Sequence, residues 1–294
     1  MDSRYGHSVP SRILAPLPRV LVALALVASA QLVLVGGVLA VSPERDGSSG
    51  AISAPEAVSP ERGGSKPARY PRGFDISYPQ CGGAYPANPA FAIVGINGGK
   101  VFSANPCLAS QIAWGGGAAS ELYVNTGNPG PALSSFWPVG QTTPRVCSAS
   151  NPDTADCAFD YGYNAAKHSY ETAAAAYQAL GIQTSPSATR WWLDVETVNS
   201  WRDDTALNVA ALQGEMAYLR DVAGITRIGI YSTTYQWGVI TGGTKVFAAH
   251  PSWGAGARSE RVAINHCTST AGFTGGPLAM VQYPYSGFDA NVLC

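Results

Sequence analysis

The chain has 294 residues, of which 46% are hydrophobic and 13% charged, and its formal net charge is −1. This length suits one large domain or two ordinary ones, and the hydrophobic fraction is ample for a packed core. A nearly neutral chain has no basic face that could neutralise a phosphate backbone, which excludes nucleic acid as a principal partner.

The N-terminal segment, residues 1–41, predicts export. Three arginines precede an uncharged run from Val20 to Val41, and a run of roughly twenty apolar residues can span a bilayer with its positively flanked end in the cytoplasm. That pattern is typical of a signal anchor. Residues 28–30, Ala-Ser-Ala, also fit a cleavage site, so a cleaved secretory signal is the alternative. Both interpretations place the rest of the chain outside the cytoplasm, either secreted or held to the membrane by residues 20–41 alone.

Residues 42–72 have the composition of a flexible linker. They are rich in Ser, Pro, Gly and Glu, and the sequence VSPER occurs at 41–45 and again at 58–62. Such a segment cannot bury enough apolar surface to order itself. We therefore expect one folded domain, residues 73–294.

From Gly73 onward, short apolar runs alternate with helical stretches. Strands are expected at 73–77, 91–96, 122–125, 191–196 and 227–232, with later ones near 252–254 and 278–283. Helices are expected at 160–180, which is Ala-rich and stops at Gly181, and at 204–222, which starts behind Asp203 and stops near Gly224. This order predicts an α/β fold, a TIM-like (β/α)-barrel with five βα units completed by three strands. A doubly wound open sheet is the alternative.

The six cysteines form an even set without the C-x-x-C spacing of zinc sites, which indicates disulfides and an oxidising compartment. Proximity in the sequence favours Cys147 with Cys157 and Cys267 with Cys294, leaving Cys81 for Cys107.

Two carboxylates interrupt the apolar run 191–197, WWLDVET. Strand alternation puts Asp194 and Glu196 on one face, with Cα atoms about 6.5–7 Å apart. An unpaired buried carboxylate is unfavourable, so such a pair at a strand end needs a reason. Capping of the next helix or pairing with an arginine would be a purely structural one.

Two more acids favour a catalytic role. Asp75 ends the first expected strand, and Asp289 follows the last one. In a closed barrel the first and last strands are neighbours, so both acids would reach the rim where barrel active sites lie. Clustered carboxylates resist joint ionisation, which keeps one of them protonated near neutral pH. The predicted catalytic residues are therefore Glu196, Asp194, Asp75 and Asp289.

Aromatic residues near these acids are candidates for contact with a sugar ring, with core packing as the alternative. Tyr231, Tyr78 and Tyr283 follow directly on strand ends, and Trp237 is a further candidate. The histidines show no paired metal-ligand spacing and no nucleophile elbow is present, so neither a metal nor a cofactor is expected.

Four motifs in this order resemble the glycoside hydrolase family 25 lysozymes, especially their secreted actinobacterial relatives. They are GFDISYPQ at 73–80, WWLDVET at 191–197, GIYSTTYQW at 229–237 and VQYPYSGFDANV at 281–292. The resemblance covers residues 73–294 and implies a barrel of five βα units and three further strands.

The resemblance also implies a monomeric enzyme that hydrolyses the β-1,4 bond between N-acetylmuramic acid and N-acetylglucosamine in peptidoglycan. Glu196 would be the general acid, Asp194 would stabilise an oxocarbenium-like or acetamido-derived intermediate, and Asp75 and Asp289 would orient groups at the site. The segments FAIVGING and ELYVNTGNPG depart from the family pattern, and Asn125 would replace a sugar-binding group there. The alternative is a non-catalytic or weakly active glycan-binding domain of the same fold.

Overall fold

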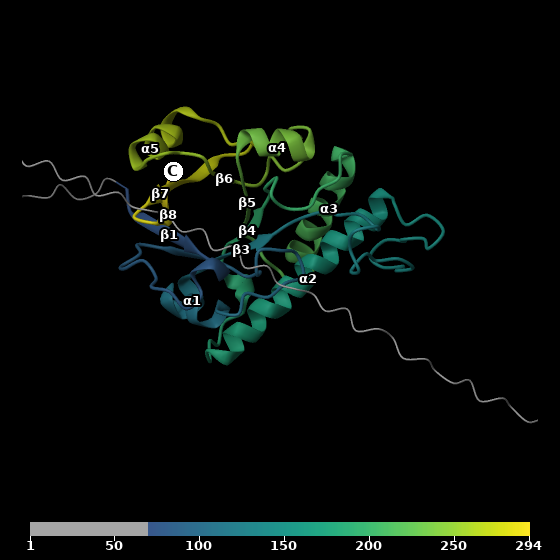
Figure 1. Ribbon diagram of the computed structural model, residues 1–294, viewed down its shortest axis with the longest axis horizontal. Helices are drawn as coiled ribbons and strands as arrows, with labels where there is room; N and C mark the ends of the chain where they lie inside the picture. The colour runs from purple at the N-terminus through teal and green to yellow at the C-terminus, as the bar shows by residue number, and fades with distance from the viewer. Residues whose placement is uncertain (1–69) are drawn as a thin grey trace, which may run out of the picture. The chain divides into compact units, whose positions relative to one another are not determined.

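Eight strands form a closed barrel in the computed structural model, which describes residues 70–294 (Figure 1). They are β1 (Arg72–Ile76), β2 (Ala92–Gly95), β3 (Glu121–Asn125), β4 (Trp191–Asp194), β5 (Ile228–Ser232), β6 (Ser252–Gly254), β7 (Leu278–Tyr285) and β8 (Phe288–Leu293). Neighbouring strands from β1 to β7 run parallel, whereas β8 is antiparallel to both β7 and β1. The predicted barrel is confirmed, and closure excludes the open doubly wound sheet.

Five α-helices cover the outside of the barrel, one after each strand from β2 to β6. They are α1 (Leu108–Trp114), α2 (Ala155–Ala179), α3 (Thr205–Ala217), α4 (Thr234–Thr241) and α5 (Glu260–Ser269). The predicted five βα units and three further strands are thus present, but the helix-free strands are β1, β7 and β8. After β1 there is only a 3₁₀ turn, Tyr78–Gln80, and α3 ends in a π-helical turn, Tyr218–Val222.

Side-chain caps explain where the two longest helices begin. The Thr154 hydroxyl accepts a hydrogen bond from the Cys157 amide at 3.2 Å, so α2 starts before the expected residue 160. Asp204 caps α3 in the same way, through a 2.9 Å bond from the Ala206 amide. Helices α1, α4 and α5 have only 7, 8 and 10 residues, so residue patterns alone did not identify them.

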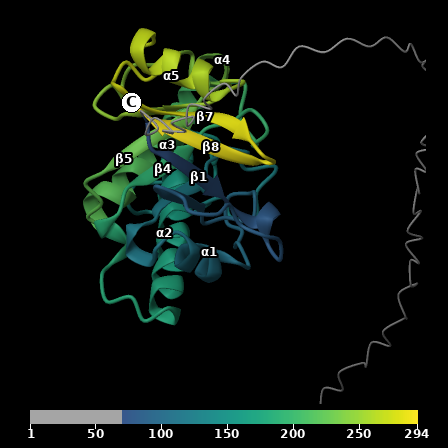
Figure 2. The ribbon, with the colours of Figure 1, turned by 90° about the vertical axis from the view of Figure 1, so that its left-hand side faces the viewer.

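Strand β8 was not predicted, and its presence corrects the placement of Asp289. That residue lies within β8 rather than after the last strand, directly opposite Asp75 of β1. Figure 2 shows β7 and β8 beside β1, so the two ends of the domain meet in one sheet. Alternation then turns Asp289 and Asn291 toward the barrel interior.

Large side chains fill the inside of the barrel below the rim. Ile93, Trp192, Trp253 and Met280 form a buried cluster there. Gly229 makes room for this packing, because a Cβ atom at its position would lie 2.2 Å from the Trp192 ring. The barrel is therefore closed at its centre, and any cavity open to solvent must lie above this floor.

Helices α2 and α3 approach each other through glycine. A Cβ atom on Gly162 would lie 1.9 Å from the carbonyl oxygen of Ala211, a backbone atom that cannot move without shifting the helix. We expect Gly162→Ala to lower the free energy of unfolding by about 1–3 kcal/mol, measured by urea denaturation. The control is Gly238→Ala in α4, where a Cβ atom meets nothing within 4 Å and the higher helix propensity of alanine should stabilise the protein slightly. Equal effects of both changes would contradict the packing argument.

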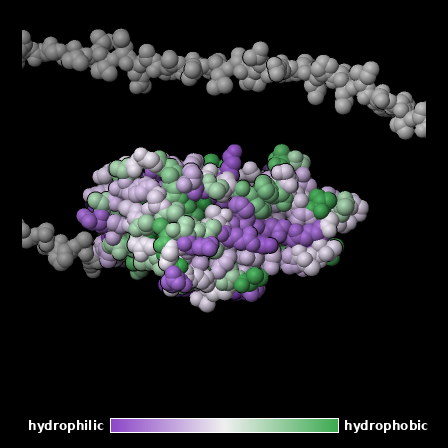
Figure 3. Space-filling model, turned by 90° about the horizontal axis from the view of Figure 1, so that it is seen from below, coloured by the Kyte–Doolittle hydropathy of each residue, from purple (hydrophilic) through white to green (hydrophobic). Residues whose placement is uncertain are grey.

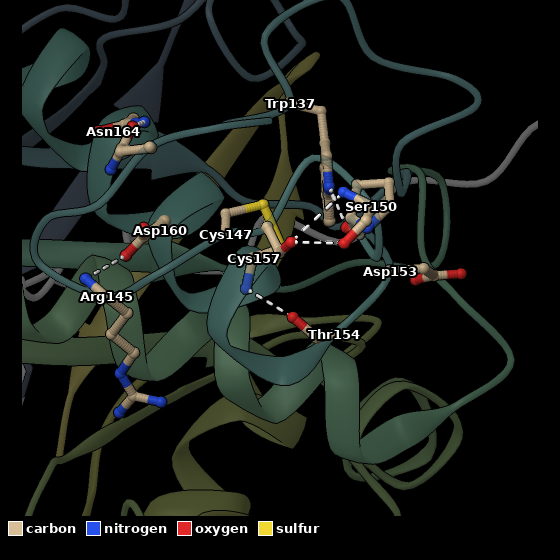
Figure 4. Close-up of a disulfide and its surroundings, with 12 residues drawn as sticks. Trp137, Arg145, Cys147, Ser150, Asp153, Thr154, Cys157, Asp160 and Asn164 are labelled. Atoms are coloured by element: carbon tan, nitrogen blue, oxygen red, sulfur yellow. Dashed lines mark hydrogen bonds between the residues drawn. A yellow bond between two sulfur atoms is a disulfide. The ribbon is translucent and has the colours of Figure 1, made fainter.

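All three predicted disulfides are present, Cys81–Cys107, Cys147–Cys157 and Cys267–Cys294. The second links the loop before α2 to the first turn of that helix (Figure 4). The predicted targeting segment and nearly all of the predicted linker lie outside the described residues. Within residues 70–294, no helix is long and apolar enough to cross a membrane.

Candidate active site

The four predicted carboxylates line one cavity of about 120 Å³ at the end of the barrel where the parallel strands finish. Tyr123, Tyr231, Trp253 and Gln282 complete its lining. Asp75 comes from β1, Asp194 from the end of β4, Glu196 from the loop two residues further on, and Asp289 from β8. The lining contains no Lys, Arg or His, so no positive side chain neutralises these acids within the cavity.

Asp194 is held in place by an amide. Its Oδ2 accepts a 2.6 Å hydrogen bond from Nδ2 of Asn125, its partner across β3 and β4. Its Oδ1 is buried and has no hydrogen-bond partner among the described residues. Asn125 does not line the cavity, so its predicted contact with a sugar is replaced by a different role, that of positioning Asp194.

A second amide fixes Asn125. The backbone N–H of Asn125 donates to Oδ1 of Asn97 at 2.9 Å. Nδ2 of Asn97 in turn donates to the Ser103 carbonyl at 3.2 Å and to the Ser169 hydroxyl at 3.4 Å. Because Asn97 is buried and bonded on both sides, the donor that faces Asp194 has little freedom to turn away.

Removing that donor should change how Asp194 titrates. Burial raises the pKa of the Asp194 carboxyl well above its usual range, and the Asn125 amide opposes this rise. We expect Asn125→Ala to raise the pKa of Asp194 further, since the lost hydrogen bond favours the charged form of the carboxyl. Titration of the side-chain ¹³C signal of Asp194 measures it. Asn199→Ala is the control, because the Asn199 amide faces the Asp194 backbone carbonyl, and an equal shift there would refute the assignment.

Asp75 is bound by two amides that residue patterns did not reveal. Oδ1 of Asp75 accepts a 2.6 Å bond from Nδ2 of Asn291, and both of its oxygens lie 3.1–3.2 Å from Nε2 of Gln282. Burial and, secondarily, the neighbouring Asp289 raise the pKa of Asp75 to about 7, although both amides act against this rise. Asn291 stands two residues after Asp289, the same i, i+2 spacing as Asp194 and Glu196, and that spacing was the available signal.

The remaining acids are also shifted toward the protonated form. Burial is the main reason that the pKa of Glu196 is raised, and the Asp289 carboxylate adds to it. Partial desolvation likewise raises the pKa of Asp289. Asp194 and Glu196 share one small space, so ionisation of either acid disfavours ionisation of the other. Such coupling favours keeping one of the two carboxyls protonated, and that carboxyl can donate its proton. Among residues 70–294, no group of His, Cys, Asp and Glu is arranged to hold a metal ion.

Only one of the predicted aromatic contacts lies in the cavity. Tyr231 lines it, and its hydroxyl donates to Oε1 of Gln282 at 2.8 Å. Tyr78 is 44% exposed and lines a neighbouring groove. Tyr123 and Trp253 lie in the cavity lining but were not among the residues selected as sugar contacts.

The predictions for Tyr283 and Trp237 as substrate contacts are wrong. Tyr283 is 2% exposed and its hydroxyl bonds to Arg72 and Glu260, because alternation along β7 turns it outward when Gln282 faces in. Trp237 is 1% exposed, packs against Phe247 and Phe273, and donates its indole N–H to the Thr244 carbonyl. Both are core residues outside the barrel.

Residues 160–262 match the family model described as Lysozyme-like protein 1 (Lys-1), less than half of the chain. The matched part holds Asp194 and Glu196 but neither Asp75 nor Asp289. No curated protein matches the sequence.

Solved structures of similar fold include lysozymes and muramidases. A family GH25 lysozyme from Aspergillus fumigatus has a TM-score of 0.51 and 16% identity, over 76% of this chain and 93% of that one. A muramidase from Acremonium alcalophilum has a TM-score of 0.47 and 19% identity, over the same shares of the two chains. At these identities the similarity shows the fold alone. It rests on the Aspergillus structure, whose TM-score is above 0.5. The predicted resemblance to the family 25 lysozymes is thereby confirmed as a lysozyme-like fold.

Proposed function

We propose that residues 73–294 are a cell-wall glycan hydrolase, a muramidase that cleaves β-1,4 bonds of peptidoglycan by carboxylate acid–base chemistry. The observation that carries this proposal is the convergence of Asp75, Asp194, Glu196 and Asp289 on one cavity without a cation. Glycosidases need one carboxyl that holds a proton and another that carries negative charge. The lysozyme-like fold supports the same class of substrate.

Glu196 is our candidate for the proton donor. It follows β4 on a loop and is less buried than Asp194, so it is the acid of the pair that can reach a glycosidic oxygen lying across the rim. The Asn125 donor favours the negative charge on Asp194 and so acts against the burial that raises the pKa of that carboxyl. Burial also raises the pKa of Glu196, which keeps this more accessible carboxyl suited to donating a proton.

In the proposed reaction, Glu196 protonates the leaving oxygen while the bond to the anomeric carbon breaks. Asp194 stabilises the positive charge that develops on the sugar, either directly or through its 2-acetamido group. Water then adds to the anomeric carbon and gives a proton back to Glu196, which completes the hydrolysis. Asp75 and Asp289 orient groups at the site. The amide network around Asp75 and Asp194 keeps these carboxylates from turning toward solvent.

The disulfides of the domain support a site of action outside the cytoplasm. Three disulfides join its six cysteines, and such bonds persist in oxidising compartments. We propose that residues 1–41 direct export and that residues 42–72 separate the barrel from the membrane or from the cleavage point.

A second candidate is a glycan-binding domain that does not cleave. The size of the carboxylate cavity favours it, since about 120 Å³ is small beside the roughly 300–1,000 Å³ of ordinary ligand sites. In the hydrolase proposal this cavity admits only the reacting groups, and the sugar rings lie over the open rim.

Digestion of purified peptidoglycan separates these functions. The full chain is incubated with the wall material, new reducing ends are reduced with borohydride, and the sugars at these ends are identified by mass spectrometry. Reduced muramic acid supports the muramidase, whereas reduced glucosamine would indicate the other β-1,4 bond. Protein that sediments with the wall but releases no ends would support the binding domain and overturn the hydrolase.

A further inference from the structure

A second, larger hollow lies on the same rim as the carboxylates. It encloses about 550 Å³ and shares no lining residue with the carboxylate cavity. Its walls come from the loops that follow β1, β2, β3 and β4, so Tyr78 stands three residues after Asp75 and Val198 two residues after Glu196. We call it the side groove. A ligand bound across the carboxylates can therefore extend into it.

The side groove has rigid walls. One wall is the long loop between β3 and α2, which the Cys147–Cys157 disulfide closes at its far end (Figure 4). Phe136 in this loop stacks on Phe102 with ring centroids 4.4 Å apart. The Trp137 indole donates to the Pro152 carbonyl at 2.7 Å. A long loop fixed in this way is typical of a binding loop.

The opposite wall is equally constrained. Gly99 has a φ of +82°, and a Cβ atom there would lie 2.5 Å from the Tyr78 ring, so the ring rests on the glycine backbone. The backbone N–H of Asn128 donates to the Ser200 carbonyl at 2.8 Å and joins the loops after β3 and β4. Because these walls are already ordered, binding of a ligand costs less conformational entropy.

The chemistry of the side groove differs from that of the carboxylate cavity. Four of its residues are large hydrophobic side chains left exposed, namely Tyr78, Leu133, Phe136 and Val198. On the face seen in Figure 3, hydrophobic residues lie in separate spots among hydrophilic ones. Lys100 is the one charged residue in the lining, and it forms no ion pair with another described residue. The aliphatic side chains of Leu133 and Val198 beside a lone ammonium suit a short peptide that carries a carboxylate.

We propose that the side groove binds the peptide stem attached to the glycan, with Lys100 pairing with a stem carboxylate and Leu133 and Val198 covering apolar stem side chains. The inference rests on the proposed function for the choice of a peptide-bearing glycan. It makes the substrate a peptide-substituted glycan strand rather than a naked one. Charge also favours this arrangement, since the carboxylate cavity repels an anionic stem and Lys100 attracts it.

Binding of three probes to the full chain tests the inference without any need for catalysis. The probes are the disaccharide of N-acetylglucosamine and N-acetylmuramic acid alone, the same disaccharide with a free-acid peptide stem, and that stem with its carboxylates amidated. Calorimetry should show tightest binding of the free-acid stem. Lys100→Met should weaken that binding about two- to fivefold and leave the amidated stem unchanged, because an exposed ion pair contributes up to about 1 kcal/mol.

Matched variants separate the groove from general surface effects. Lys167→Met removes an exposed lysine of α2, and Val222→Ser removes an exposed aliphatic residue after α3. Neither should change binding, whereas Leu133→Ser should weaken both stem probes about fivefold and spare the naked disaccharide. Equal affinity of all three probes, or equal loss for all three in Lys100→Met, would overturn the inference. Stem binding without release of reducing ends would instead overturn only the hydrolase.

Discussion

Replacing Glu196 by glutamine is expected to lower the rate of reducing-end release from peptidoglycan about 10²- to 10⁴-fold, which is the usual contribution of a general acid. Glutamine keeps the shape and the hydrogen-bonding capacity of the side chain but has no proton to give to the leaving oxygen. Binding to wall material should be retained or slightly strengthened, because the change removes a carboxylate from a crowded acidic cavity. Initial rates and sedimentation with the wall measure the two effects.

The control for this change is Glu171→Gln, an exposed glutamate on α2 that pairs loosely with Lys167. It makes the same chemical substitution outside the cavity and should leave the rate unaltered. Full activity in Glu196→Gln would exclude Glu196 as the proton donor. A comparable fall in both variants would point to a general loss of folded protein, which the midpoint of thermal unfolding would reveal.

The barrel could be predicted because the same strand pattern recurs along the chain. Apolar runs such as 191–194 mark parallel strands buried on both faces, and the acids at their ends mark the rim. Asp75 and Asp289 could be brought together only by assuming closure, and the structure sets them directly opposite each other. Their catalytic roles remain proposals.

The sequence did not predict which side chains point into the site. Tyr283 and Gln282 are adjacent in the sequence, and a strand places them on opposite faces, so the register decides which of the two meets Asp75. That register depends on β8, which pairs with β7 on one side and with β1 on the other. Asp289 and Asn291 interrupt the apolar residues of β8, so its sequence does not read as a strand. Trp237 was misplaced for a similar reason, because α4 could not be recognised.

A strong pH effect should come from Asp75, whose pKa in the folded protein is raised to about 7 from the ordinary 3.8. Between these two pH values the folded state binds a proton that the unfolded state has lost. The stability contributed by this group is therefore full below about pH 4 and declines as the pH rises to about 7. About three pKa units correspond to about 4 kcal/mol.

Asparagine at this position does not titrate, so the variant Asp75→Asn lacks that decline. The unfolding free energy of the variant, relative to that of wild type, should rise by about 4 kcal/mol between pH 4 and pH 8, measured by urea denaturation at each pH. Asp153→Asn provides a control of opposite sign, because the Arg202 guanidinium lowers the pKa of Asp153 and its contribution is lost as the pH falls. Parallel pH profiles of wild type and Asp75→Asn would show that Asp75 ionises as in the unfolded chain. Asp75 thus destabilises the barrel at neutral pH, although Gln282 and Asn291 both donate hydrogen bonds to it. Such a carboxyl is expected in a site that is selected for chemistry rather than for stability.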